Sequence, residues 1–233
     1  MAKFDRTIAL FGKDNFLKLQ RAKVLIFGIG GVGGHLVEAL ARSGIENFCL
    51  VDGDVVSESN INRQIIATTK TVGQPKVEAM KERILEINPN AKVETKQLFY
   101  LPDNCSEICF EDFDYVVDAI DTVTAKVDII ERAYKLGKNI ISAMGAGNKI
   151  NTSEFIVADI FNTKVCPLAK IMRKLLKERG VAKLKVVYSE EVPYNSTLIE
   201  NGKRIPASNS FVPGMAGLTM AREVILDIIG INE

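Results

Sequence analysis

Four glycines between residues 28 and 33 have the spacing of a phosphate-binding turn: Gly28, Gly30, Gly31 and Gly33. They follow an apolar run at 23–27 and precede a helical stretch at about 32–43. Glycine lets the backbone approach a phosphate without a Cβ clash, and the free N–H groups of a helix N-terminus attract the anion. We therefore predict a nucleotide site here rather than a glycine-rich turn without a ligand.

One acidic residue stands where such a site needs it. Asp52 ends the next apolar run, at 48–52, and lies nineteen residues after Gly33. In dinucleotide-binding folds an acid at about this distance bonds a ribose hydroxyl. Because the glycine loop and Asp52 suit NAD as well as ATP, an NAD-dependent dehydrogenase is one interpretation of these residues.

Two cations in the following segment favour ATP. Arg63 and Lys76 stand near several other polar residues, namely Asp54, Asn60, Asn62 and Gln64. A triphosphate carries more charge than a dinucleotide, and its departing part gains charge as the α-phosphorus is attacked. Arg grips phosphate with a planar fork and Lys acts as a point charge. The alternative for either cation alone is a solvated surface charge.

A second acidic group, Asp118 and Asp121 with Thr122, follows the apolar residues 115–117. Ligands of open α/β sheets bind beyond the carboxyl ends of the strands, where these side chains are expected. Asp121 is the candidate ligand for Mg²⁺, which binds through one or two carboxylates plus substrate phosphates. Asp118 fits the nucleotide site as well as it fits a helix cap or a charge at the sheet edge.

The elements that position these residues alternate along the chain. Strands are expected at 23–27, 48–52, 93–98, 115–118 and 140–143, with helices between most of them. This order predicts an α/β, Rossmann-like, mainly parallel sheet with helices on both faces. Residues 148–233 are expected to extend the 1–147 nucleotide-binding core with two strands, a long mobile loop at 189–210 and a final helix, all in a single domain.

Charge and composition limit the kinds of binding partner that the protein is expected to have. The net charge is +1, and 47% of residues are hydrophobic, as in soluble globular proteins. The sequence has no signal-peptide core and no apolar run of membrane-spanning length, so a cytoplasmic protein without membrane contact is expected. Residues 164–185 hold eight cations and one acid, which suits a phosphate backbone as well as a solvated face. The candidate RNA contacts are Lys170, Arg173, Lys174 and Lys177, with Lys203 and Arg204 in the loop.

Together these motifs resemble the superfamily of ubiquitin-activating-type enzymes, which includes bacterial activators of sulfur-carrier proteins. The resemblance is carried by Gly28–Gly33, Asp52, the 60–64 segment, Gly73 with Lys76, and Asp118 with Asp121. It implies that the loop and Asp52 bind ATP, that Arg63 and Lys76 contact its phosphates, and that Asp121 supports Mg²⁺. It also implies a homodimer in which Arg6 reaches the partner's ATP site.

Within that superfamily the chain looks like the tRNA threonylcarbamoyladenosine dehydratase branch. Segments at 38–44, 143–147, 157–160, 167–169 and 210–213 carry this likeness, and the paired Cys-x-x-Cys motifs of zinc-binding sulfur-carrier activators are missing. The likeness implies adenylation of a threonyl carboxylate on tRNA, then cyclisation, for which Cys166 is not required. It leaves open a sulfur-transfer protein as a further partner. The alternatives are an activator of a small ubiquitin-like sulfur-carrier protein and a non-catalytic binding module.

Overall fold

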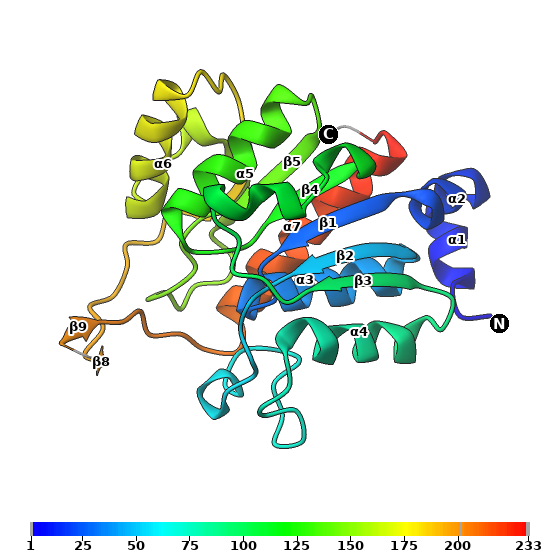
Figure 1. Ribbon diagram of the computed structural model, residues 1–233, viewed down its shortest axis with the longest axis horizontal. Coiled ribbons are helices and arrows are strands. Elements are labelled where there is room, and N and C mark those ends of the chain that lie inside the picture. Colours follow the sequence, from blue (N-terminus) through cyan, green and yellow to red (C-terminus); the bar gives the residue numbers. More distant parts are fainter. Residues whose placement is uncertain (1, 201, 232–233) are drawn as a thin grey trace.

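The computed structural model describes residues 2–200 and 202–231 as one sheet with helices on both faces and a small hairpin (Figure 1). The helices are α1 (Asp5–Phe11), α2 (Lys13–Arg21), α3 (Gly31–Ser43), α4 (Lys76–Ile87), α5 (Val123–Lys135), α6 (Pro167–Glu178) and α7 (Val212–Ile229). The strands are β1 (Lys23–Phe27), β2 (Asn47–Val51), β3 (Lys92–Lys96), β4 (Tyr115–Asp118), β5 (Asn139–Ala143), β6 (Phe155–Asp159), β7 (Lys185–Ser189), β8 (Ile199–Glu200) and β9 (Lys203–Arg204).

The main sheet has the strand order β3-β2-β1-β4-β5-β7-β6. All neighbouring pairs are parallel except β6 and β7. The chain moves outward in one direction through β2 and β3 and in the other through β4 and β5. The order therefore reverses between β1 and β4, where open α/β sheets leave a crevice for ligands. This arrangement confirms the predicted Rossmann-like α/β fold.

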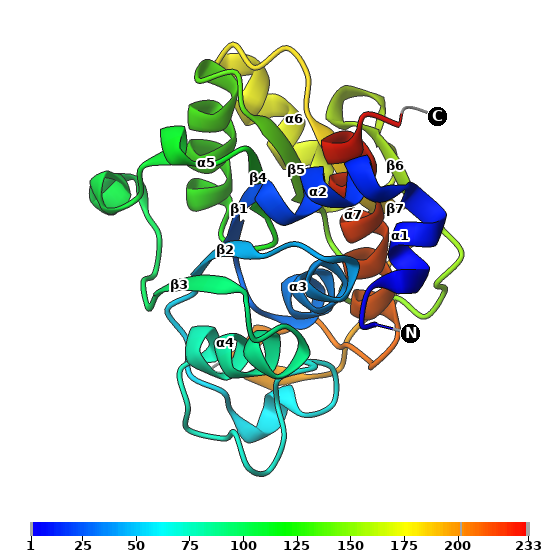
Figure 2. The ribbon, with the colours of Figure 1, turned by 90° about the vertical axis from the view of Figure 1, so that its right-hand side faces the viewer.

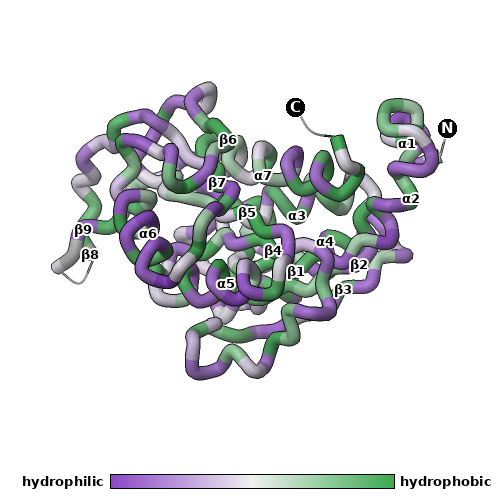
Figure 3. Tube along the Cα trace, turned by 90° about the horizontal axis from the view of Figure 1, so that it is seen from above, coloured by the Kyte–Doolittle hydropathy of each residue, from purple (hydrophilic) through white to green (hydrophobic). Residues whose placement is uncertain are grey.

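Two helical layers cover the sheet, as Figure 2 shows. On one face α3 packs against α7 and α4, and its core contains Leu36, Leu40, Met80 and Val224. On the other face α5 packs against α6 and against β4 and β5. Because both faces are covered, the central strands consist of nearly continuous apolar residues, which Figure 3 shows as hydrophobic stretches inside the molecule.

The last third of the chain adds its strands to the same sheet. β7 pairs in parallel with β5, in the register Ser142↔Val186, and β6 pairs with the outer edge of β7. Within the segment predicted as a long mobile loop at 189–210, β8 and β9 form a two-stranded hairpin. None of the described helices combines the length and apolar character that crossing a membrane requires.

Candidate functional site

A cavity of about 1010 Å³ lies at the carboxyl ends of β1, β2, β4 and β5. It brings together residues from four separate segments that were predicted to bind a nucleotide. Those that line it are Gly28, Gly30, Gly31, Asp52, Asp54, Asn60, Arg63, Gln64, Lys76, Asp121 and Thr122. The side chains therefore meet at the crevice that the strand order predicts.

The glycine loop needs glycine for two separate reasons. Gly28 has φ +90°, and a Cβ there would lie 2.7 Å from the Ala119 carbonyl oxygen. A Cβ at Gly33 would lie 1.8 Å from the Gly28 carbonyl oxygen, so Gly33 does not line the cavity but lets α3 begin against the loop. Gly30 caps α3, and the first N–H groups of that helix are available to a phosphate.

Asp52 holds the loop in this shape. Its Oδ2 accepts a hydrogen bond from the Ile29 N–H at 2.6 Å, and its Oδ1 accepts one from the Asp54 N–H at 2.9 Å. Burial raises the pKa of Asp52, while the nearby charge of Lys76 and the two backbone bonds act in the opposite direction. Each carboxylate oxygen keeps a second lone pair, so Asp52 can still accept a bond from a ribose hydroxyl.

Lys76 lies at the N-terminus of α4 with its ammonium in the cavity wall. Its Nζ is 2.6 Å from Asp54 Oδ2, and its side chain is 7% exposed, against 50% for that of Asp54. The exposed carboxylate can turn toward solvent at low cost. The buried ammonium is thereby positioned to contact an anion that enters the cavity.

The segment after β2 positions Arg63 and presents an unpaired acceptor. Arg63 Nη1 donates to Ser59 O and to Asn62 Oδ1, both at 2.9 Å, so Asn62 orients Arg63 although it does not line the cavity itself. Gln64 is buried, and its Oε1 has no hydrogen-bond partner among the described residues. Because that oxygen is buried, a donor on a ligand could reach it only if the Gln64 side chain turned.

The structure corrects the expectation that Asp118 faces the nucleotide. Its side chain is fully buried, forms an ion pair with Lys126 Nζ at 2.8 Å, and accepts a bond from Ser142 Oγ at 2.6 Å. Lys126 also donates to Ile120 O at 3.1 Å and to Ala143 O at 2.8 Å, two carbonyls at the cavity floor. The pair therefore joins the ends of β4 and β5 beneath the cavity. A lysine on an apolar helix face gave no signal of this role in the sequence.

Asp121 and Thr122 are exposed in the cavity beyond β4. Asp121 alone of the two acids can thus hold Mg²⁺ against a substrate phosphate. Among the residues that the structure describes, no three His, Cys, Asp or Glu side chains gather into a metal-binding cluster. One carboxylate is nevertheless a sufficient protein ligand when phosphate oxygens and water complete the shell.

Arg6 lies away from this cavity. It is exposed on α1, which Figure 1 shows beside α2, at the end of the sheet where β1 begins. Arg6 does not line the cavity of its own chain.

Only some of the cations that were predicted to contact RNA are exposed and free to do so. Lys170, Lys174 and Lys177 are exposed on α6, and Arg204 is exposed on β9, whereas the side chain of Lys203 lies outside the described part of the structure. Arg173 corrects the expectation of a cation free to bind RNA. It is half-buried and donates to Thr163 O at 2.9 Å and to the Thr163 hydroxyl.

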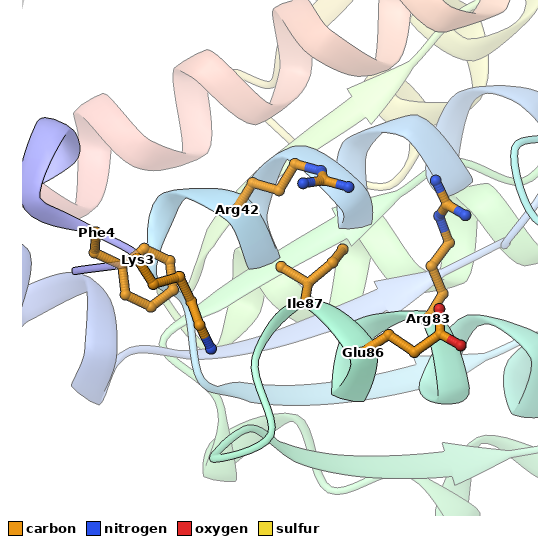
Figure 4. A pocket seen from close by; sticks show the side chains of 6 residues that line it. All are labelled: Lys3, Phe4, Arg42, Arg83, Glu86 and Ile87. Carbon is orange, nitrogen blue, oxygen red and sulfur yellow. The ribbon is translucent and has the colours of Figure 1, made fainter. Parts of the chain in front are cut away.

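A smaller cavity, of about 380 Å³, lies near the C-terminal ends of α3 and α4 (Figure 4). Arg42 and Arg83 line it, and both form ion pairs with Glu38. Burial favours the neutral form of Glu38, but bonds from the two arginines outweigh it and hold its pKa below the usual value. Arg83 on α4 thus joins that helix to Glu38 on α3, whereas the Arg42–Glu38 pair lies within α3. The other lining residues are Lys3, Phe4, Glu86 and Ile87.

Comparison with known proteins places the chain in one family. The model of the ThiF family matches residues 4–233. A tRNA threonylcarbamoyladenosine dehydratase of Bacillus subtilis is 38% identical over 240 residues, 97% of this chain and 94% of the relative. Crystal structures of TcdA, the E. coli tRNA N6-threonylcarbamoyladenosine dehydratase, superpose with TM-scores of 0.91 with AMP and 0.89 with ATP, at 32% identity, covering 98% of this chain and 94% of TcdA.

A more distant relative is the adenylyltransferase and sulfurtransferase UBA4 of Candida glabrata. It is 37% identical over 133 residues, which cover 57% of this chain and 30% of UBA4. The matched region, the strand order and the cavity agree with the resemblance that the motifs carry. The chain belongs to the ThiF family.

Proposed function

We propose that this protein adenylates the threonyl carboxylate of threonylcarbamoyladenosine in tRNA with ATP and drives its cyclisation. The observation that carries the proposal is one cavity lined by the glycine loop, Asp52, Arg63, Lys76 and Asp121. The dehydratase from Bacillus subtilis supports it because the similarity extends over 97% of this chain. We further propose that the reaction takes place in the cytoplasm.

The chemistry is mainly positioning and charge stabilisation. The substrate carboxylate attacks the α-phosphorus of ATP, a carboxyl oxygen–phosphorus bond forms, and pyrophosphate leaves with the electron pair of the broken bond. Arg63 and Lys76 offset the charge that develops on the departing phosphates. Mg²⁺ held by Asp121 would supply further charge neutralisation there. The adenylated carboxyl then closes onto a neighbouring side-chain atom and releases AMP, with net loss of water from the nucleoside.

The position of α6 supports tRNA as the substrate. Cys166, Pro167 and Leu168, at the start of α6, line the cavity, and Lys170, Lys174 and Lys177 are exposed along the same helix. An RNA backbone along α6 can therefore place one modified base at the cavity mouth. Phosphate contacts of this kind weaken as salt concentration rises.

Activation of a small ubiquitin-like sulfur-carrier protein is the second candidate, favoured by the similarity to UBA4. In that reaction the carboxylate is the C-terminus of a protein, and a sulfur-transfer protein is the next partner. Cys166 lines the cavity but is 2% exposed.

One comparison separates the two candidates. The protein is incubated with ATP and either threonylcarbamoyladenosine-containing tRNA or a sulfur-carrier protein, and both products are examined by mass spectrometry. We expect loss of 18 Da, roughly the mass of one water, from the nucleoside, as the dehydration chemistry requires. Adenylation of the carrier C-terminus without dehydration of the tRNA would instead favour the second candidate.

We further propose a homodimer in which Arg6 completes the partner's ATP site. The position of Arg6 on α1, away from the cavity of its own chain, supports this arrangement. Arg6→Ala and Lys76→Ala alone are each expected to keep at most about 1% of wild-type turnover. Co-expressed, they should regain about a quarter of wild-type activity, since random pairing gives half of the dimers one complete site. No regain in a verified mixed dimer would show that Arg6 does not act across the interface.

A further inference from the structure

Lys149 is a buried cation on the wall of the large cavity. It follows β5 in the segment 144–149, lines the cavity, and is 4% exposed. Only three lysines or arginines line this cavity in the described chain, and Arg63 and Lys76 both follow β2. Lys149 alone lies beyond β5, two strands away from the glycine loop in the sheet order.

The backbone around Lys149 is tightly held. Asn209 Nδ2 donates to Lys149 O at 2.9 Å, and the carboxylate of Glu191 accepts bonds from Ile150 N at 2.9 Å and Asn151 N at 3.0 Å. Glu191 and Asn209 lie near opposite ends of the 189–210 segment, so both ends of that segment hold the backbone at and after Lys149. The backbone that carries the Lys149 side chain is therefore fixed by the fold.

The ammonium itself has fewer partners than it can use. Its Nζ donates to the Glu191 carbonyl oxygen, and this is its one hydrogen bond among the described residues. An ammonium has three N–H donors, and a buried cation with unfilled donors is costly. Burial lowers the pKa of Lys149, while Cys166 and the Glu191 carboxylate act in the opposite direction. An anionic group from a ligand would satisfy the remaining donors.

We propose that Lys149 binds the carboxylate that is to be adenylated and holds it toward the α-phosphorus of ATP. Arg63 and Lys76 lie on the nucleotide side of the cavity, so the carboxylate occupies the β5 side near Cys166 and the start of α6. Lys149 transfers no proton in this role and acts by charge and orientation. The inference rests on the proposed function and adds the residue that recognises the acceptor group.

The test compares two anticodon stem-loop RNAs, one with threonylcarbamoyladenosine and one with its carboxamide. Binding is measured with a non-hydrolysable ATP analogue present. Wild type is expected to prefer the acid by about tenfold to a hundredfold, as for a hydrogen bond between charged groups. Lys149→Met should abolish the preference by weakening binding of the acid alone. Lys149→Gln, which can still donate to Glu191 O, serves if Lys149→Met fails to fold.

Lys174→Met is the matched control, because it removes an equal charge from the exposed face of α6. This variant should weaken the binding of both RNAs by the same factor and leave the preference for the acid over the carboxamide unchanged. Equal binding of acid and carboxamide by wild type would count against the proposed substrate itself. A preference that persists in a folded Lys149 variant would overturn the assignment of Lys149 while leaving the proposed function intact.

Discussion

Replacing Lys76 with alanine is expected to lower ATP-dependent turnover by about a hundredfold to a thousandfold, the usual loss on removing one charge-stabilising group. Its ammonium is nearly buried in the cavity wall, 2.6 Å from Asp54, and it shares the cavity with the glycine loop. Because pyrophosphate gains charge as it leaves, the loss should appear mainly in kcat. Pyrophosphate release with saturating tRNA and ATP is the measurement.

The fold of this variant should survive, because Asp54, which loses its ion-pair partner, has a side chain that is 50% exposed and can be hydrated. Lys81→Ala is the matched control, since Lys81 lies on the same helix but does not line the cavity. It should keep near wild-type turnover. Full activity in Lys76→Ala would refute the assignment of Lys76 to the phosphates.

The nucleotide half of the cavity was predictable because its signals are local. Gly28 is required by its positive φ and its close approach to the Ala119 carbonyl, and Gly33 by its close approach to the Gly28 carbonyl. Asp52 directly follows β2, whose last residue pairs with the last residue before the loop, so its place follows from parallel pairing. The strands and helices around these residues also have clear apolar runs, which is why their bounds agree closely with the structure.

The acceptor half was not predictable in the same way. The contacts that hold Lys149 form only when β7 enters the sheet beside β5 and the 189–210 segment brings Glu191 and Asn209 to it. Such a placement depends on long-range pairing, which no short window of sequence contains. The two N-terminal helices, α1 and α2, were also missed, since each is short and carries many polar residues.

Asp118 shows how one motif can serve two purposes. Sequence reasoning favoured Asp121 as the Mg²⁺ ligand and left Asp118, the last residue of β4, open between the nucleotide site, a helix cap and the sheet edge. In the fold they point to different surroundings: Asp121 is exposed in the cavity, and Asp118 is sealed beneath it with Lys126. Asp118 is the last residue of β4, whereas Asp121 lies three residues beyond the strand, which places the two carboxylates in different environments.

Lys126→Met is expected to lower the free energy of unfolding by about 3–5 kcal/mol, the usual cost of leaving one member of a buried ion pair alone. The carboxylate of Asp118 would remain buried without its counter-charge, and Ile120 O and Ala143 O would lose a donor. Urea denaturation measures the effect. Because those carbonyls belong to the cavity floor, affinity for ATP should fall as well.

The double variant Asp118→Asn with Lys126→Met separates charge from packing. It removes the unpaired charge while its amide can still accept the bond from Ser142 Oγ, so it should regain a large part of the lost stability. Arg132→Met is the matched control, since its ion pair with Asp128 is partly exposed and should contribute under about 1 kcal/mol. A double variant as unstable as Lys126→Met would mean that the lost bonds to β4 and β5, and not the buried charge, set the cost.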